Sequence, residues 1–283
     1  MPRRGIVAAM TKTHDKNTST QGTATKGHSK GSNGPFDPAY MRPSEYRQDK
    51  SPAVRPRDAA TLILVRHDDN APRILMGKRH AGHKFMPNKY VFPGGRVDRA
   101  DSRITPARDL SPPVQRQLMD RMRGGRPTPA RARSYALAAV RETFEETGLV
   151  VGAANQDAPP KSRHADWNAY FQQGALPDLS KFRMVARAIT PPYRTRRFDT
   201  RFFIGDASAI LSDMHDTGGA SGELLDLHWL TIAEARDLEL PNITRAVLAE
   251  VEARLVEPAK ANRRPVPFIY FRGAKPVQDK IAP

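Results

Sequence analysis

The sequence predicts an α/β fold, an α/β/α sandwich in which helices cover both faces of a mixed β-sheet. Between residues 59 and 271, segments with strand periodicity and segments with helix periodicity are interspersed without a regular strand–helix–strand repeat. The first two strands are separated by a short turn and so form a hairpin, which a purely parallel sheet would not contain. With 283 residues, the chain is long enough to bury a sizeable core.

Apolar, β-rich segments define the predicted strands. They are residues 59–66, 73–79, 89–93, 181–189, 201–205, 223–230 and 267–271. The stretch between the first two, His-Asp-Asp-Asn-Ala-Pro, is rich in the residues that form turns. The third strand ends at the double glycine Gly94-Gly95, where a backbone amide or carbonyl can approach a ligand without side-chain interference.

Helical spacing of apolar residues predicts the helices. They are expected at residues 112–123, 134–147, 165–173, 232–238 and 242–255. The first of these places Val114, Leu118 and Met122 on one face. The second is rich in good helix formers and is followed by Gly148, which suits the position just after a helix C-terminus.

Composition divides the chain into tails, a domain and an insertion. Residues 1–55 are expected to be a disordered basic tail, because their polar residues cannot bury enough apolar surface to offset the entropy of ordering. Residues 56–275 form the predicted domain, with an insertion at 102–133, and residues 276–283 form a C-terminal tail. Residues 1–57 carry 11 Lys and Arg against four Asp and Glu, and the insertion carries eight against two. Such charge either attracts anionic partners or only keeps these segments solvated.

Cysteine content and hydropathy exclude several classes of protein. The chain has no cysteine, which excludes disulfides, thiol catalysis and thiolate metal sites and leads us to expect a cytoplasmic protein. No run of 18 or more apolar residues is present, so no membrane span is expected. The N-terminal segment lacks the apolar region of a signal peptide.

Residues 141–148, Arg-Glu-Thr-Phe-Glu-Glu-Thr-Gly, are the most informative segment of the chain. On a helix, Glu142, Glu145 and Glu146 stand at i, i+3 and i+4, so three carboxylates crowd one face. Like charges at this spacing repel one another, and a helix selected only for stability would avoid them. Hard cations such as Mg²⁺ reverse this balance, because they take carboxylate oxygens and keep water ligands for a phosphate substrate. The segment therefore predicts a divalent-metal site.

Together with Gly95, this segment resembles the Nudix box, Gly-x5-Glu-x7-Arg-Glu-U-x-Glu-Glu-x-Gly-U, where U is a bulky apolar residue. Residues 141–149 fit its second half, with Thr143 departing at a U position. Asp101 stands in place of the first Glu, and 39 residues (102–140) replace the usual seven. A box split at this point resembles the Nudix subgroup of the peroxisomal coenzyme A diphosphatases. Further motifs similar to that subgroup are residues 85–95, 189–191, 197–203 and 222–229.

The resemblance implies a Nudix-type fold, a requirement for Mg²⁺ or Mn²⁺, and roles for individual residues. Glu142 and Glu146 are the expected metal ligands, and the backbone carbonyl of Gly94 or Gly95, with Gly95 preferred, is expected to complete the metal shell. Glu145 ligates through water, acts as the base, or is held by Arg141. Arg141 is expected to orient the carboxylates rather than to touch substrate, because its permanent charge and fixed donor geometry suit that role.

Two acidic candidates lie outside the acidic helix. Asp101 is either a structural residue or a functional substitute for the first Glu of the box. Glu223, in a glycine-rich loop before a strand, resembles the downstream carboxylate that some Nudix enzymes use as base or additional metal ligand. The alternative for Glu223 is a solvated loop residue. His164 is interpreted as a surface residue and Trp167 as part of the core.

A basic loop over residues 190–200 supplies the expected substrate ligands. Arg194, Arg196 and Arg197 are predicted to bind phosphate oxygens of the substrate, because the guanidinium fork fits phosphate geometry. In the alternative interpretation, Arg197 and Arg201 pair with Asp199 and only shape the loop.

These features predict a Nudix hydrolase that cleaves a nucleoside diphosphate linked to another moiety, by attack of metal-activated water on the diphosphate. The subgroup resemblance favours coenzyme A or an acyl-CoA as substrate. Lys84 and Asn88 stand where the coenzyme A signature has Arg and Gly, so NADH and ADP-ribose stay open as substrates. The alternative is a non-catalytic Nudix module that binds nucleic acid or a protein partner through its basic tail and insertion. The intact carboxylates favour the enzyme, for which no specific nucleic-acid partner is expected.

Overall fold

The computed structural model describes residues 53–82, 88–214, 221–273 and 275–283. All of them belong to one unit of the chain, residues 34–283. The tail predicted over residues 1–55 lies outside the described residues except for 53–55. Residues 85–87 of the motif that leads into the double glycine also lie outside.

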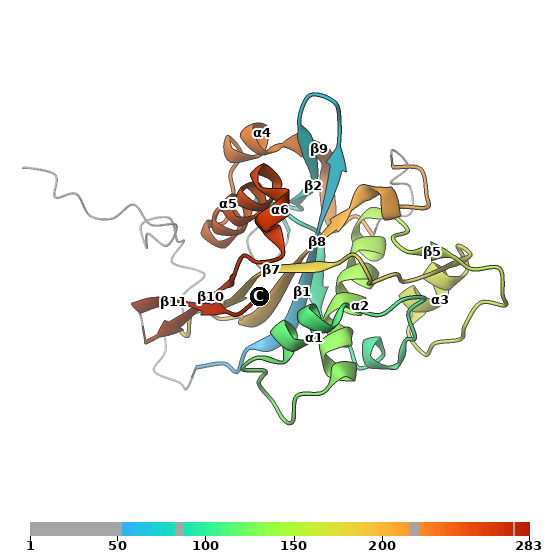
Figure 1. Ribbon diagram of the computed structural model, residues 1–283, viewed down its shortest axis with the longest axis horizontal. Helices are drawn as coiled ribbons and strands as arrows, with labels where there is room; N and C mark the ends of the chain where they lie inside the picture. The colour runs from blue at the N-terminus through green and yellow to red at the C-terminus, as the bar shows by residue number, and fades with distance from the viewer. Residues whose placement is uncertain (1–52, 83–87, 215–220, 274) are drawn as a thin grey trace, which may run out of the picture. The chain divides into compact units, whose positions relative to one another are not determined.

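A nine-stranded mixed sheet forms the centre of this unit (Figure 1). Its order is β11-β10-β7-β8-β1-β2-β3, with β4 also paired to β1 and β9 to β2. The strands are β1 (Arg57–His67), β2 (Pro72–Arg79), β3 (Tyr90–Val91), β4 (Gly94–Arg96), β7 (Arg183–Ile189), β8 (Phe198–Asp206), β9 (Leu224–Thr231), β10 (Val266–Arg272) and β11 (Lys275–Ile281). β8 runs parallel to β1 and β10 to β7, whereas the other pairs are antiparallel. The predicted mixed sheet and its β1–β2 hairpin are therefore confirmed.

Helices cover both faces of the sheet (Figure 1). The helices are α1 (Pro112–Met119), α2 (Pro129–Thr147), α3 (Ala165–Phe171), α4 (Ile232–Arg236), α5 (Asn242–Val256) and α6 (Pro258–Ala261), with short 3₁₀ turns η3 (Asp101–Arg103) and η4 (Ala207–Ala209). A separate two-stranded sheet pairs β5 (Ala153–Ala154) with β6 (Ala175–Leu176).

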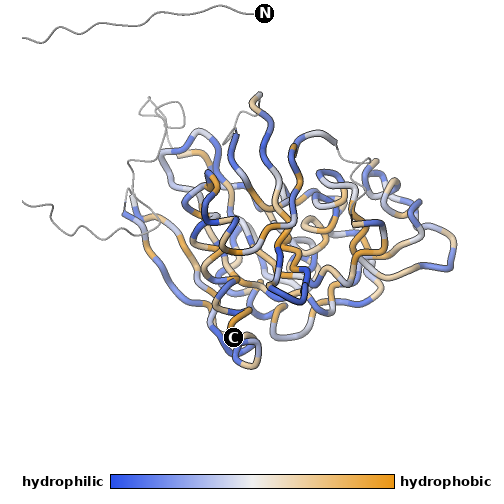
Figure 2. Tube along the Cα trace, turned by 90° about the horizontal axis from the view of Figure 1, so that it is seen from above, coloured by the Kyte–Doolittle hydropathy of each residue, from blue (hydrophilic) through white to orange (hydrophobic). Residues whose placement is uncertain are grey.

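Successive side chains of β1 contribute to two different apolar clusters, one on each face of the sheet. Leu62 and Leu64 pack with residues of α1, α2 and α3 in one apolar cluster. Ile63 and Val65 point to the opposite face and pack with α4 and α5 in a second cluster. Successive side chains of a strand point to opposite faces, so a continuous apolar run is what a strand covered on both sides requires. Figure 2 shows hydrophobic stretches running through the interior of the unit between hydrophilic turns.

The insertion at 102–133 is folded into the domain rather than appended to it. Ile104, Leu110, Val114, Leu118 and Met122 are all buried in the first cluster, which confirms the apolar stripe predicted for residues 112–123. The guanidinium of Arg187 on β7 donates to the backbone carbonyls of Asp120 and Arg121 and so fastens the end of α1 to the sheet.

The C-terminal residues differ from the prediction. Residues 276–283 were expected to form a tail, but residues up to Ile281 belong to β11, which pairs with β10 along seven residue positions. The segment is a strand at the edge of the sheet and carries Lys, Asp and Pro, which are residues typical of edge strands. Only Ile281 is buried, so the segment has no apolar periodicity from which a strand could be predicted.

Candidate active site

The helix α2 places the acidic segment against the sheet. It begins five residues before the predicted start, because Thr128 accepts a hydrogen bond from the backbone N–H of Arg131 and Pro129 occupies the first turn. It ends at Gly148, which has a φ of 76° and so takes the left-handed conformation that glycine adopts without strain. Thr143, the departure from the Nudix pattern, is fully buried and donates its hydroxyl to the Ala139 carbonyl.

The double glycine makes room for two carboxylates of α2. The Gly94 amide donates to Glu146 Oε2 at 2.7 Å. A Cβ on Gly95 would lie 2.2 Å from Glu142 Oε2, so the Glu142 carboxylate lies directly against the Gly95 backbone. A Cβ on Gly94 would lie 2.5 Å from the Ala60 carbonyl of β1. Both glycines are therefore required by close packing of the strand, the helix and its carboxylates.

Arg141 is buried, and its guanidinium contacts oxygen atoms of four residues. Its Nε lies 2.9 Å from Asp101 Oδ1, and its Nη2 donates to the Arg96 carbonyl at 2.8 Å. Its Nη1 lies 3.0 Å from Glu142 Oε1 and 3.4 Å from Glu145 Oε2. Burial by itself lowers the pKa of Arg141, but the hydrogen bond with Asp101 and the charge of Glu142 outweigh burial and raise it. The guanidinium is therefore permanently charged. The expected orienting role of Arg141 agrees with these contacts.

Asp101 is a structural anchor for Arg141. It is completely buried, and besides Arg141 it accepts hydrogen bonds from Trp167 Nε1 at 2.8 Å and from the Asp98 amide at 2.7 Å. These partners occupy both oxygens of the carboxylate. The contacts of Asp101 therefore support a structural role and not a functional replacement of the first Glu of the Nudix box. Trp167 itself is fully buried, as expected, and it links α3 to the site.

Burial raises the pKa of two glutamates of α2 and so favours their protonated form. It raises the pKa of Glu142 to about 7, and the charge of Glu145 adds to this while Arg141 opposes it. Burial also raises the pKa of Glu146 to about 8, against the opposing effects of the Gly94 amide and the charge of Arg79. Without a cation, two buried carboxylates of this kind tend to hold a proton at neutral pH.

Glu145 and Glu223 lie close together although they are far apart in the sequence. The Ser221 amide donates to the backbone carbonyl of Glu145, and the Glu223 carbonyl accepts from the His80 amide. The pKa of Glu145 is raised by burial, by the neighbouring Asp166 carboxyl and by the charge of Glu223. The charge of Glu223 also raises the pKa of Glu146. Glu223 thus belongs to the carboxylate cluster of Glu142, Glu145, Glu146 and Glu223.

The donor set of this cluster fits a hard divalent cation. Carboxylate oxygens are the ligands that such cations prefer, and a positive charge would favour the ionised state that burial disfavours. The missing Cβ of Gly95 leaves its backbone accessible beside Glu142. Within the described ranges, no three Asp, Glu or His side chains already converge as a preassembled metal cage. Glu142 is instead paired with Arg141, and Glu146 with the Gly94 amide.

The loop of the arginines predicted to bind substrate is separated from the double glycine. Their loop ends at Phe198, which pairs with Arg57, whereas Gly95 pairs with Ala60 on the other edge of β1, about 10 Å further along that strand. Arg197 donates to the carbonyls of Thr190 and Val54. These bonds support the alternative in which Arg197 shapes the loop.

The other arginines of this region differ in exposure. Arg194 is buried and burial lowers its pKa, whereas Arg196 is exposed. Asp199 pairs with Arg187 at 2.8 Å and with Arg201 at 3.1 Å, so the predicted Arg201–Asp199 pair is confirmed and the Arg197–Asp199 pair is not the one that forms.

Sequence reasoning missed two neighbours of the carboxylate cluster. Arg79 stands at the end of β2, and its charge lowers the pKa of Glu146. Asp166, in the first turn of α3, acts on Glu145 and also lies 3.3 Å from His164. His164 is half-buried in this pair, in contrast to the surface position expected for it. The contact between α3 and α2 is long-range, so no local pattern in the sequence could have indicated it.

Comparison with known proteins connects this geometry to one family. A family model described as the NUDT19 Nudix domain matches residues 56–240. The acyl-coenzyme A diphosphatase NUDT19 of Gallus gallus is 27% identical over 179 residues, which cover 46% of this chain and 47% of that protein. The protein of the same name from Xenopus laevis is 25% identical over 212 residues, covering 57% of this chain and 53% of that protein. The chain thus spans about half the length of these relatives.

A solved structure is also similar to this chain. A NUDIX hydrolase from Alicyclobacillus acidocaldarius has 25% sequence identity and a TM-score of 0.48, covering 69% of this chain and 90% of that one. Among the described residues, every helix is too short or too polar to cross a membrane.

Proposed function

Because the chain belongs to the family of the NUDT19 Nudix domain and is a Nudix hydrolase, we propose that it cleaves coenzyme A or an acyl-CoA at the diphosphate. Hydrolysis of nucleoside diphosphates linked to another moiety is the general activity of the family. The observation that supports this proposal is the carboxylate cluster of Glu142, Glu145, Glu146 and Glu223, in which Glu142 and Glu146 contact the double glycine. NADH and ADP-ribose are the other substrates in this class.

Nudix hydrolases generally use divalent cations, and we assign Mg²⁺ or Mn²⁺ to Glu142, Glu146 and the Gly95 carbonyl. When bound there, the cation would neutralise the diphosphate and lower the pKa of the attacking water. Arg141 positions Glu142 and Glu145 through its fixed donors and its permanent charge.

Glu145 is our choice for the general base. Burial and its acidic neighbours raise its pKa, which makes its carboxylate a stronger proton acceptor. Its side chain is also 32% exposed, so water can reach it. Glu223 lies beside it and would assist as a second acceptor for the proton or as a further metal ligand. Of the three arginines in the basic loop, Arg196 is the one whose exposed guanidinium we assign to a substrate phosphate.

The test is a product-release screen with the purified full chain. Coenzyme A, an acyl-CoA, NADH and ADP-ribose are incubated with Mg²⁺ or Mn²⁺, and the cleaved nucleotides are separated by chromatography. We expect turnover of at least one coenzyme A compound, loss of turnover in Glu142→Gln, and no change in the exposed control Glu257→Gln. Absence of hydrolysis with every compound and both metals would overturn the proposal.

A non-catalytic module that binds nucleic acid is the competing function. RNA binding that persists at high salt and is unaffected by Glu142→Gln, together with no hydrolysis, would establish it, since non-specific binding through counterion release weakens steeply with salt. The lack of cysteine leads us to propose a reducing compartment such as the cytoplasm for either function.

A further inference from the structure

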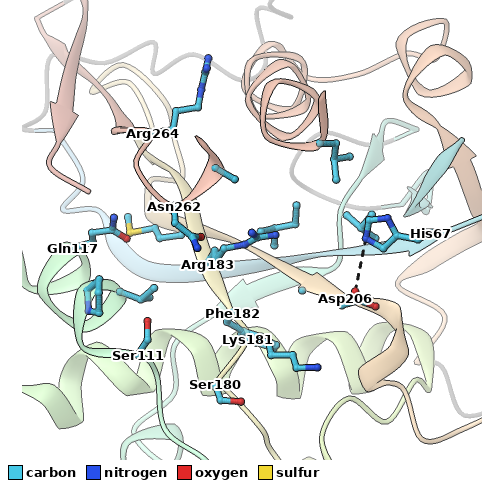
Figure 3. Close-up of a pocket in the computed structure, with 18 residues that line it drawn as sticks. His67, Ser111, Gln117, Ser180, Lys181, Phe182, Arg183, Asp206, Asn262 and Arg264 are labelled. Carbon is cyan, nitrogen blue, oxygen red and sulfur yellow. Dashed lines mark ion pairs between the residues drawn. The ribbon is translucent and has the colours of Figure 1, made fainter. Parts of the chain in front are cut away.

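A cavity of about 590 Å³ lies away from the carboxylate cluster, near the C-terminal ends of β1 and β8 (Figure 3). One wall is α1 of the insertion, and another is formed by the end of α5 and the segment after α6. The floor includes the first residues of β7. β10 pairs with β7 at Arg187 and Ala188, so it leaves these first residues beside the cavity uncovered. A volume of this size accommodates a small organic molecule.

Positive charge dominates the lining of the cavity. Its cationic side chains are Lys181, Arg183 and Arg264, whereas Asp206, 3.7 Å from His67, is the acidic side chain among its lining residues. Within the described part of the chain, Arg183 has no carboxylate at ion-pair distance. An uncompensated guanidinium beside a cavity attracts an anion, and its planar donors match phosphate oxygens.

Arg254 and Arg264 add to the positive charge beside the cavity. Arg264 and the buried Arg254 share the single carboxylate of Glu250, at 3.2 Å for Arg264. Arg183 and Arg264 both lower the pKa of Arg254, after the larger effect of its burial. Three guanidiniums with one acidic partner therefore leave this end of the sheet with excess positive charge.

Neutral donors are available as well. Gln117 of α1 is only 9% exposed, lines the cavity, and has no hydrogen-bond partner for its amide among the described residues (Figure 3). The polar atoms of this amide are not sealed from solvent, so they are available to a ligand in the cavity. The same helix begins at the edge of the cavity, where Ser111 is its N-cap residue but makes no side-chain capping bond. Pro112 and Pro113 occupy the first two positions of this helix and carry no N–H, so at this end of α1 the Ser111 hydroxyl, and not a row of backbone amides, is the donor that faces the cavity.

We propose that this cavity binds a small phosphomonoester, with Arg183 and Gln117 as its recognition residues. Arg183 would pair with the phosphate, Gln117 would donate its amide, and Lys181 would add charge at the rim. The proposal gives the insertion a function, since its helix supplies Gln117 and its N-cap residue Ser111 lines the cavity. It is independent of the substrate assigned to the carboxylate cluster.

The test is a titration of the full-length protein with adenosine 5′-monophosphate, in the presence of EDTA, by isothermal calorimetry. Adenosine is the uncharged comparison, and inorganic phosphate tests the phosphate group alone. We expect the monophosphate and phosphate to bind and adenosine not to bind. Arg183→Gln and Gln117→Leu should each weaken binding by about tenfold, the value of one charge-assisted or buried hydrogen bond.

The matched control is Arg116→Gln. Arg116 precedes Gln117 on α1 but is exposed and does not line the cavity, so its removal changes the net charge equally. It should alter affinity less than about twofold, since distant surface charges are screened by salt. Binding that is unchanged in both Arg183→Gln and Gln117→Leu, or no binding up to about 5 mM ligand, would overturn the proposal. Circular dichroism of each variant verifies that it is folded.

Discussion

At the residue scale, the buried carboxylates make the stability of the metal-free protein depend on pH. The pKa of Glu146 is about 8 and that of Glu142 about 7, both above the ordinary 4.5 of glutamate. The folded state therefore holds these protons more tightly than the unfolded state. The stabilisation is fully present below about pH 4.5 and is lost as the pH rises through about 7 to 8.

Glu146→Gln tests this sign. Glutamine resembles the protonated carboxyl and keeps an oxygen for the Gly94 amide, so in EDTA the variant should lose less thermal stability than wild type between about pH 5 and about pH 9. With Mg²⁺ present, its turnover number should fall at least about a hundredfold, because charge is removed where it is needed in the transition state. Melting curves and steady-state kinetics provide the two measurements. Equal pH slopes in both proteins would show that Glu146 is ionised without metal.

The buried pair of Asp101 and Arg141 gives a second prediction. Asp101→Asn leaves the buried guanidinium without its main partner, and we expect a loss of about 3 kcal/mol in the free energy of unfolding. The control Asp109→Asn breaks the partly exposed pair with Arg133 and should cost about 1 kcal/mol or less. Denaturant titration of both variants measures the difference. Similar losses would mean that the burial of Asp101 contributes no additional stability.

At the element scale, the two glycines of β4 have different functions, so replacing each with alanine should have a different effect on folding and turnover. Gly95→Ala places a methyl group in the position of the Glu142 carboxylate, a side chain that can rotate away, so the protein should fold but lose most of its turnover. Gly94→Ala meets the Ala60 backbone at 2.5 Å and is also strained by a φ of 155°, so it should lower the yield of folded protein. Circular dichroism, expression yield and kinetics separate the two outcomes. A fully active Gly95→Ala would contradict the arrangement.

The same elements show how far the sequence could predict the site. The helix α2, the turn at Gly94 and Gly95 and the hairpin before it are local features, so periodicity and glycine placement were sufficient to predict them. The contacts of Asp101 with Trp167, and of Glu145 with the 221–223 segment, join residues that are more than 60 positions apart. Such contacts depend on how elements pack. The position of the basic loop relative to Gly95 could not be predicted for the same reason, since it follows from the register of β1 and β8.

At the scale of the whole molecule, the split in the box does not separate its two halves. The insertion leaves β4 through η3, buries α1 against the sheet, and returns as the first turns of α2. Asp101 and Arg141, at the two sides of the split, are in direct contact. The insertion is thus part of the core and cannot be treated as a removable loop.

The two ends of the chain should therefore respond differently to truncation. Removing residues 276–283 deletes the ladder with β10 and exposes the site of Ile281, which is 1% exposed, so we expect a loss of about 2–5 kcal/mol. In a protein of this size that loss corresponds to a fall in melting temperature of at least about 5 °C. Removing residues 1–52 should change it by less than about 2 °C, because the composition of that segment supplies no core. Calorimetry of the two truncated proteins beside the full chain is the measurement. A melting temperature that falls more on N-terminal than on C-terminal truncation would show that the basic segment packs on the domain, and that β11 contributes little to its stability.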